Sequence, residues 1–334
     1  MTQMTLSQAL NRAHHDVMAA DDHIIVIGED IHGGSGVTGG QELGGVFGVT
    51  RGLASRFGAG RVIDTPISET AFVGMATGAA MTGLKPIVEV MFCDFMGVCF
   101  DQIMNQAAKA RFLSNGRFDL PLVIRTTMGA GDGSGAMHSQ STFGMLSTVP
   151  GLMVACPSSP ADAAGLLKSA VAAKGPTILM EHKGLYGHAD TVEDDLPAVP
   201  IGKGRVVREG TDLTIIAVSA FVHKAEAAAE ALKKDGIEAE VIDPRTIKPL
   251  DEALILESVK KTGRLLVASE DAAFAGFADA VISFVTRAGF ADLKAAPVAV
   301  TPPDMPVPYG RRAEAKWLPT AETIIKAAKK MMEA

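Results

Sequence analysis

RVIDTPISETAFVGMATGAAMTGLKPIVEVMF, residues 61–92, decides the fold because it contains a strand, a helix and a second strand in turn. The segments RVIDT, residues 61–65, and KPIVEVMF, residues 85–92, each predict a strand. Between them, fifteen residues without charge follow Glu69, which predicts a buried helix. A strand, a helix and a strand in this order are typical of a βαβ unit with parallel strands.

The same alternation continues on both sides of this unit. Apolar runs bounded by turn-forming residues recur through both halves of the chain, at 23–30, 120–129, 151–157, 176–182, 212–220, 239–247 and 264–271. We predict an α/β protein with two doubly wound parallel-sheet domains. Residues 188–203 mix acidic residues, proline and glycine without periodicity, and predict a linker between a domain at 1–187 and a domain at 204–334.

Composition excludes several classes of function. The 334 residues carry a net charge of −7, which argues against nucleic acid or an anionic membrane as partners. The uncharged run 70–84 is shorter than the roughly 18 apolar residues that a membrane span needs. The three cysteines form neither a metal-binding pair nor a disulfide framework, and the N-terminus has no secretory pattern, so we expect a cytoplasmic protein.

Two glycine motifs suggest cofactor sites. Gly34, Gly36 and Gly39 have the spacing of a dinucleotide fingerprint after a strand, but further glycines follow where a helix should begin, so a nicotinamide enzyme is a distant alternative. Gly131-Asp132-Gly133 resembles the opening of the magnesium–diphosphate motif of thiamin diphosphate enzymes, but no asparagine follows about 25 residues later. We therefore predict no metal ligands on this chain.

Glu69 has two interpretations. With Ser68 or Thr65 as the helix cap, its charge at the positive end of a helix stabilises that helix by about 0.3–1 kcal/mol and needs no further role. However, the helix also contains Gly74 and Gly78, which each cost about 1 kcal/mol relative to alanine. Such glycines favour a helix that another chain segment approaches closely.

The spacing of Glu69, Gly74 and Gly78 resembles the pyrimidine-domain signature of thiamin diphosphate enzymes. Nearly the whole chain, from about residue 4 to 332, resembles the β subunit of the first component of 2-oxoacid dehydrogenase complexes. The segments that carry the resemblance include VIGEDI, DTPISE, FDQIMNQAAK, HSQ, GLMVACPSSPADAAGLLKSA and PDMPVPYG. Within that family, MFCDFMGVCFDQIMNQAAK and EHKGLYG look most like acetoin dehydrogenase β subunits.

The resemblance implies a role for four residues. Glu69 would hydrogen-bond a ring nitrogen of the cofactor's aminopyrimidine and begin its activation, Phe95 would stack on that ring, and Ile67 would line it. His138, in the segment MHSQ, would assist proton transfer or acyl transfer. Ala173 stands where relatives often carry aspartate in a monovalent-cation site, so the resemblance gives little support for potassium.

The resemblance also implies an assembly. Thiamin diphosphate would be shared with an α subunit, which would hold the diphosphate and magnesium in an α2β2 heterotetramer. The C-terminal domain would contact a second β subunit and the lipoyl-bearing dihydrolipoamide acyltransferase. Acetoin is the expected substrate, which would yield acetaldehyde and an acetyl group on lipoamide. Pyruvate or a branched-chain 2-oxoacid is the alternative.

Overall fold

A computed structural model of the protein describes residues 1–32 and 44–333, in two compact units. The first unit comprises residues 1–128 and 146–201, and the second comprises residues 129–145 and 202–334. The loop 129–145 therefore differs from the predicted boundaries, since it groups with the second unit. The reason is that its backbone amides hydrogen-bond to Glu270 and Glu314.

The first unit contains a parallel sheet with the order β6-β7-β5-β4-β2-β3. Its strands are β2 (Ile24–Glu29), β3 (Val62–Thr65), β4 (Lys85–Phe92), β5 (Val123–Met128), β6 (Met153–Ala155) and β7 (Thr177–His182). A small antiparallel pair joins β1 (Thr2–Thr5) to β8 (Ala189–Val192). The segment predicted as a linker thus contains a strand that pairs with the N-terminus.

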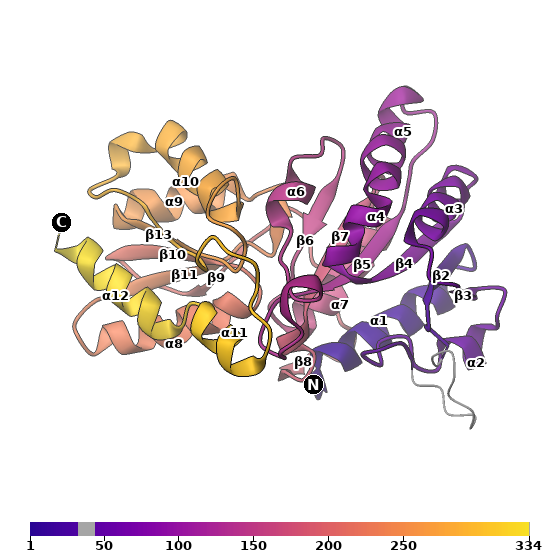
Figure 1. Ribbon diagram of the computed structural model, residues 1–334. Coiled ribbons are helices and arrows are strands. Elements are labelled where there is room, and N and C mark those ends of the chain that lie inside the picture. Colours follow the sequence, from indigo (N-terminus) through magenta and orange to yellow (C-terminus); the bar gives the residue numbers. More distant parts are fainter. Residues whose placement is uncertain (33–43, 334) are drawn as a thin grey trace. The chain divides into compact units, whose positions relative to one another are not determined.

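Helices cover both faces of this sheet (Figure 1). They are α1 (Leu6–Ala20), α2 (Leu53–Phe57), α3 (Glu69–Met81), α4 (Met96–Asp101), a π-helical turn η2 (Gln102–Ala107), α5 (Ala108–Leu113) and α7 (Pro160–Ala172). Helices α3, α4 and α5 lie on one face, and α1 and α7 on the other (Figure 1). A capping box begins α1, because Thr5 and Gln8 bond each other's backbone amides.

The second unit has a five-stranded sheet with the order β14-β13-β10-β11-β9. Its strands are β9 (Arg205–Arg208), β10 (Leu213–Ala217), β11 (Ala239–Asp243), β13 (Leu265–Ala268) and β14 (Val298–Val300), and a short strand β12 (Thr246–Lys248) follows β11 in the chain. Only the edge strand β9 is antiparallel to its neighbour. The predicted α/β class with parallel sheets is confirmed.

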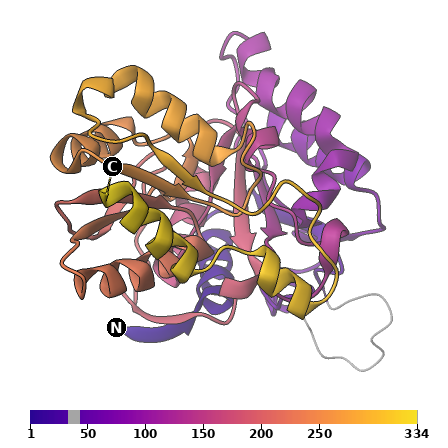
Figure 2. The same ribbon diagram turned by 60° about the vertical axis from the view of Figure 1, so that its left-hand side comes forward.

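The helices of the second unit also lie on two faces. Helices α9 (Glu252–Thr262) and α10 (Phe277–Ala288) lie opposite α8 (Ala220–Lys233) and α12 (Ala321–Met332), as Figures 1 and 2 show. The short helix α11 (Arg311–Trp317) precedes α12, and α6 (Phe143–Ser147) spans the end of the loop 129–145. None of the helices within residues 1–32 and 44–333 has both the length and the apolar character to cross a membrane.

Candidate active site

Glu69 is the first residue of α3 and directly follows the strand β3 and its loop. Ser68 is the helix cap, although its side chain makes no capping hydrogen bond. The Glu69 side chain is buried, with 8% of the residue exposed, and no described residue donates a hydrogen bond to its carboxylate. A buried carboxylate without a donor is costly, and the positive end of α3 offsets only part of that cost.

A second acid lies near enough to Glu69 for their charges to interact. Glu29 ends the strand β2, only 7% of it is exposed, and its Oε1 has no hydrogen-bond partner among the described residues. Burial raises the pKa of Glu29, and the charge of Glu69 raises it further, against a hydrogen bond from the Ser68 backbone. Sequence reasoning missed this pair, although an acid at the carboxyl end of a buried parallel strand is a signal for a ligand-facing group.

The two glycines of α3 after Glu69 have different surroundings. A Cβ on Gly74 would lie 3.0 Å from the Gln102 Oε1 in the adjoining π-helical turn, so this glycine does meet a close neighbour. A Cβ on Gly78 would meet nothing within 4 Å in this chain. Cys99 on α4 is buried, and burial together with Glu69 raises the pKa of its thiol to about 12, which keeps it protonated.

Phe95 belongs to an aromatic cluster at the end of β4. Its ring lies 5.5 Å from that of Phe92 in an edge-to-face arrangement, and Phe92 meets Phe47 in the same way at 6.2 Å. Phe47 in turn stacks on Tyr186 at 4.9 Å. Phe95 is therefore half-buried and held by aromatic contacts. Ile67, by contrast, is 85% exposed.

A buried ionic network crosses the sheet beneath this cluster. Arg125 on β5 binds both carboxylate oxygens of Glu181 at 2.8 and 2.7 Å, and its third nitrogen donates to Glu89 at 2.6 Å. The Tyr186 hydroxyl also donates to Glu181, at 2.7 Å. Burial raises the pKa of Glu89 while Arg125 opposes that rise. The network ties β4, β5 and β7 together.

His138 belongs to the second unit, in the loop that follows β5. It comes directly after a 3₁₀ turn, η3 (Gly135–Met137), and is half-buried. Glu69, Ile67 and Phe95 belong to the first unit.

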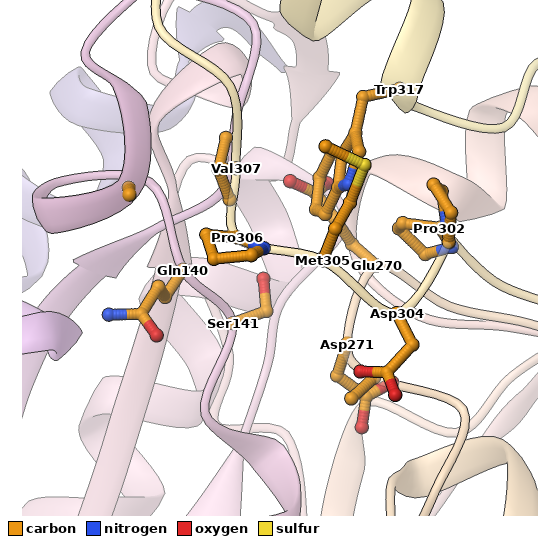
Figure 3. A pocket seen from close by; sticks show the side chains of 13 residues that line it. Gln140, Ser141, Glu270, Asp271, Pro302, Asp304, Met305, Pro306, Val307 and Trp317 are labelled. Atoms are coloured by element: carbon orange, nitrogen blue, oxygen red, sulfur yellow. The ribbon is translucent and has the colours of Figure 1, made fainter.

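The loop of His138 also lines a cavity of about 380 Å³ within the second unit. Figure 3 shows Gln140 and Ser141 of that loop, the segment 302–307, and Trp317 of α11 around it. Asp271 lies at this cavity, and burial raises its pKa to about 6 despite hydrogen bonds from Ser269 and Phe277.

The structure describes only one of the two glycine motifs. Gly34, Gly36 and Gly39 lie outside the described residues. Gly131-Asp132-Gly133 lies in the loop of His138, where the backbone amides of Gly131 and Gly133 each donate to Glu314 at 2.7 Å. Among residues 1–32 and 44–333, no group of three or more potential metal ligands is clustered.

These residues fit the aminopyrimidine of thiamin diphosphate. Glu69 offers a buried carboxylate that accepts no hydrogen bond from the part of the chain that the structure describes, which matches a ring nitrogen that can share a proton with it. Phe95 offers an aromatic ring fixed by its neighbours.

Comparison with known proteins identifies both domains. Residues 2–188 match the transketolase pyrimidine-binding domain, and residues 202–324 match the transketolase C-terminal domain. An "Acetoin:2,6-dichlorophenolindophenol oxidoreductase subunit beta" from Cupriavidus necator is 45% identical over 99% of this chain and 98% of its own length. The subunit of the same name from Bacillus subtilis is 43% identical, over 96% of this chain and 95% of its own length. A pyruvate dehydrogenase E1 component subunit beta from Rickettsia conorii is 41% identical, over 98% of both chains.

A solved structure shows the same fold. A split-gene transketolase, described as an inactive beta4 tetramer, superposes with a TM-score of 0.79 at 23% identity, and covers 99% of this chain and 98% of its own. Both transketolase domains thus occur in order along a chain that matches its relatives from end to end. The chain therefore belongs to the transketolase-like β subunits of the first component of 2-oxoacid dehydrogenase complexes.

Proposed function

We propose that this chain is the β subunit of an α2β2 thiamin diphosphate-dependent acetoin dehydrogenase. The observation that carries the proposal is Glu69 at the start of α3 in a pyrimidine-binding domain, a buried carboxylate to which no residue among 1–32 and 44–333 donates. The choice of acetoin rests on the full-length likeness to two acetoin oxidoreductase β subunits, at 45% and 43% identity. Acetoin would be cleaved to acetaldehyde, and the remaining acetyl group would pass to oxidised lipoamide.

Each site residue has a distinct task in this proposal. Thiamin diphosphate, when bound, supplies a carbon nucleophile that attacks the substrate carbonyl. Glu69 shares a proton with the pyrimidine ring nitrogen, and Phe95 holds the ring by stacking. Ile67 is free to cover the ring because its side chain is not used in the core of the first unit. His138 gives and takes protons at the substrate or acyl oxygen.

The proposed assembly agrees with the exposed surface of the first unit. Large apolar side chains stand in solvent on α3 and on the continuous helix from α4 to α5, namely Met75 (49% exposed), Val98 (62%), Phe112 (85%) and Leu113 (73%). Exposed apolar groups gathered on neighbouring helices mark a protein interface. We assign this surface to the α subunit, which would also hold the diphosphate and magnesium. A second β subunit and the lipoyl-bearing acyltransferase complete the proposed assembly.

Co-expression with an α subunit tests the proposal. The purified complex is stripped of cofactor and assayed with acetoin, pyruvate and branched 2-oxoacids, with an artificial electron acceptor as the readout. We expect turnover that requires added thiamin diphosphate and magnesium, and a preference for acetoin. Preference for pyruvate would keep the residue roles and change the substrate, which the 41% identity to a pyruvate dehydrogenase β subunit makes the second candidate. Turnover of the stripped complex without thiamin diphosphate would overturn the proposal.

A further inference from the structure

The loop that carries His138 is unusually rich in glycine with positive φ. Gly129, Gly131, Gly133 and Gly135 alternate along it, with φ of 93°, 126°, 91° and 70°. Glycine loses more conformational freedom on folding than any other residue. A loop with four such positions needs strong local contacts to hold one conformation.

Glu314 supplies those contacts. Glu314 belongs to α11 in the same unit, and it is fully buried, with 0% of the residue exposed. Its Oε2 accepts hydrogen bonds from the amides of Gly131 and Gly133, both at 2.7 Å, and its Oε1 accepts one from Gly135 at 3.0 Å. Three backbone donors on one carboxylate form a nest of the kind that otherwise binds a phosphate or another anion. In this protein the anion is the carboxylate of Glu314, a residue of the same chain.

The nest connects directly to His138. The carbonyl oxygen of Gly135 accepts a hydrogen bond from the His138 amide at 3.2 Å, while the Gly135 amide donates to Glu314. The base of the loop is closed by the Gly129 amide, which donates to the Gln140 carbonyl at 3.1 Å. One residue, Gly135, therefore links the anchoring carboxylate to the backbone of the histidine.

Neighbouring side chains add to the anchor. The Ala130 amide donates to Glu270 at 2.5 Å, and the Arg311 Nε donates to the Asp132 carbonyl at 3.1 Å. A Cβ at position 135 would lie 2.9 Å from the Tyr309 ring, so that position is filled by packing as well. These contacts position the loop but touch none of the reacting groups.

We infer that Glu314 is a positioning residue, which fixes the glycine loop and thereby the placement of His138. This inference rests on the proposed function of His138. It also gives a use to Gly131-Asp132-Gly133, whose resemblance to a diphosphate-binding motif is explained by a nest for an internal carboxylate.

The experiment compares Glu314→Gln with Glu322→Gln in the complex with the α subunit. Glu322 is an exposed acid on the next helix, α12, so it controls for loss of one negative charge. In E314Q the neutral amide cannot accept all three bonds. We expect hydrogen exchange of the amides at 131, 133 and 135 to be at least tenfold faster, with exchange in β10 and β11 unchanged. We also expect about a tenfold fall in kcat, while E322Q matches the parent in both measurements.

A His138→Ala background separates this inference from the proposed function. If Glu314 acts through His138, E314Q lowers kcat in the parent but has no further effect in H138A. Equal loss in both backgrounds would overturn the positioning role, and so would unchanged exchange in E314Q. Full activity of H138A would instead overturn the catalytic role of His138 itself. Should E314Q fail to fold, Glu314→Asp serves as a second variant, because it keeps the charge with a shorter side chain. We expect its amide exchange rates and its kcat to lie between those expected for the parent and for E314Q. Parental values for E314D would again overturn the inference.

Discussion

Two regions of this molecule bury carboxylates in opposite ways. At the start of α3, the charges of Glu29 and Glu69 interact, and among the described residues donors are missing for the Glu69 carboxylate and for Oε1 of Glu29. In the loop of His138, Glu314 is buried more deeply still, yet it accepts three backbone hydrogen bonds.

The difference indicates which acid acts on a ligand and which one stabilises the backbone of a loop. A buried polar group without partners costs about 1–3 kcal/mol, and more if it is charged, so a fold retains one where a ligand supplies the missing partner. A fully buried carboxylate with three backbone donors already has partners on both oxygens, so it needs no ligand and stabilises the backbone that it binds. The predictions below test this distinction in order of expected effect.

The largest effect is expected for Glu69→Gln. The amide keeps the size of the side chain but cannot exchange a proton with the cofactor, and proton transfer by a positioned side chain contributes roughly 10²–10⁴ in rate. We expect turnover of the assembled complex to fall about 10³-fold with assembly intact, measured by the acceptor assay and by gel filtration. Glu252→Gln is the control, because Glu252 is an exposed acid in the first turn of α9. Parental turnover in E69Q would reduce Glu69 to a helix-end charge.

Arg125→Met tests the third arrangement, in which buried carboxylates are paired with a cation. Arg125 is 2% exposed, and its removal leaves Glu89 and Glu181 buried without their cationic partner. Breaking such a network costs about 3–5 kcal/mol. We expect a large drop in thermal midpoint, or no folded chain at all.

The exposed pair of Arg111 and Asp119 provides the control for this experiment. Both side chains are about half exposed, and such pairs are worth about 0–1 kcal/mol. Arg111→Met should therefore barely change the midpoint. A similar midpoint for both variants would show that the Arg125 network contributes little.

The sequence was sufficient for the architecture because strands and helices are encoded by local patterns. The run 61–92 formed the predicted strand, helix and strand as β3, α3 and β4. The helical stretch after β4, from Met96 to Leu113, has a π-helical turn at Gln102–Ala107 in its middle that no apolar pattern indicated.

The site could be predicted only where one residue carried the signal. Glu69 stood out because its charge interrupts an apolar stretch. The partners of buried charges did not stand out, because the two residues of each pair are far apart in the sequence. Arg125 meets Glu181 across 56 positions, and Gly131 meets Glu314 across 183. No local pattern encodes such pairs, and the same long-range bonds group the loop 129–145 with the second unit.

Asp271 is an intermediate case, since each of its oxygens accepts one hydrogen bond but burial still dominates. Its pKa is about 6 in the folded protein against a usual value of 3.8. As pH rises from about 4 to 6, the unfolded chain loses this proton first, so stability falls through that window by about 3 kcal/mol and is then constant.

Asp271→Asn should remove this loss of stability. We expect the difference in thermal midpoint between parent and D271N to change between pH 4 and 6 and to stay level from pH 7 to 8. Asp304→Asn, at an exposed acid of the same cavity, should follow the parent throughout. A constant difference between parent and D271N would show that Asp271 ionises normally.

Glu29→Gln is expected to have the smallest effect. The sign of its effect on the thermal midpoint is the sharpest test of the difference between the two regions. Burial and Glu69 raise the pKa of Glu29, so its ionised form destabilises the fold above that pKa. Removing the charge should stabilise the isolated chain by about 1 kcal/mol, or a rise of roughly 2–4 °C in thermal midpoint near pH 8. The gain should shrink as pH falls and the parent carboxyl takes up its proton. E314Q should move the midpoint the other way, because it breaks bonds that are already made. If E29Q instead lowers the midpoint, Glu29 must be stabilised by partners, and the two regions would bury their acids alike.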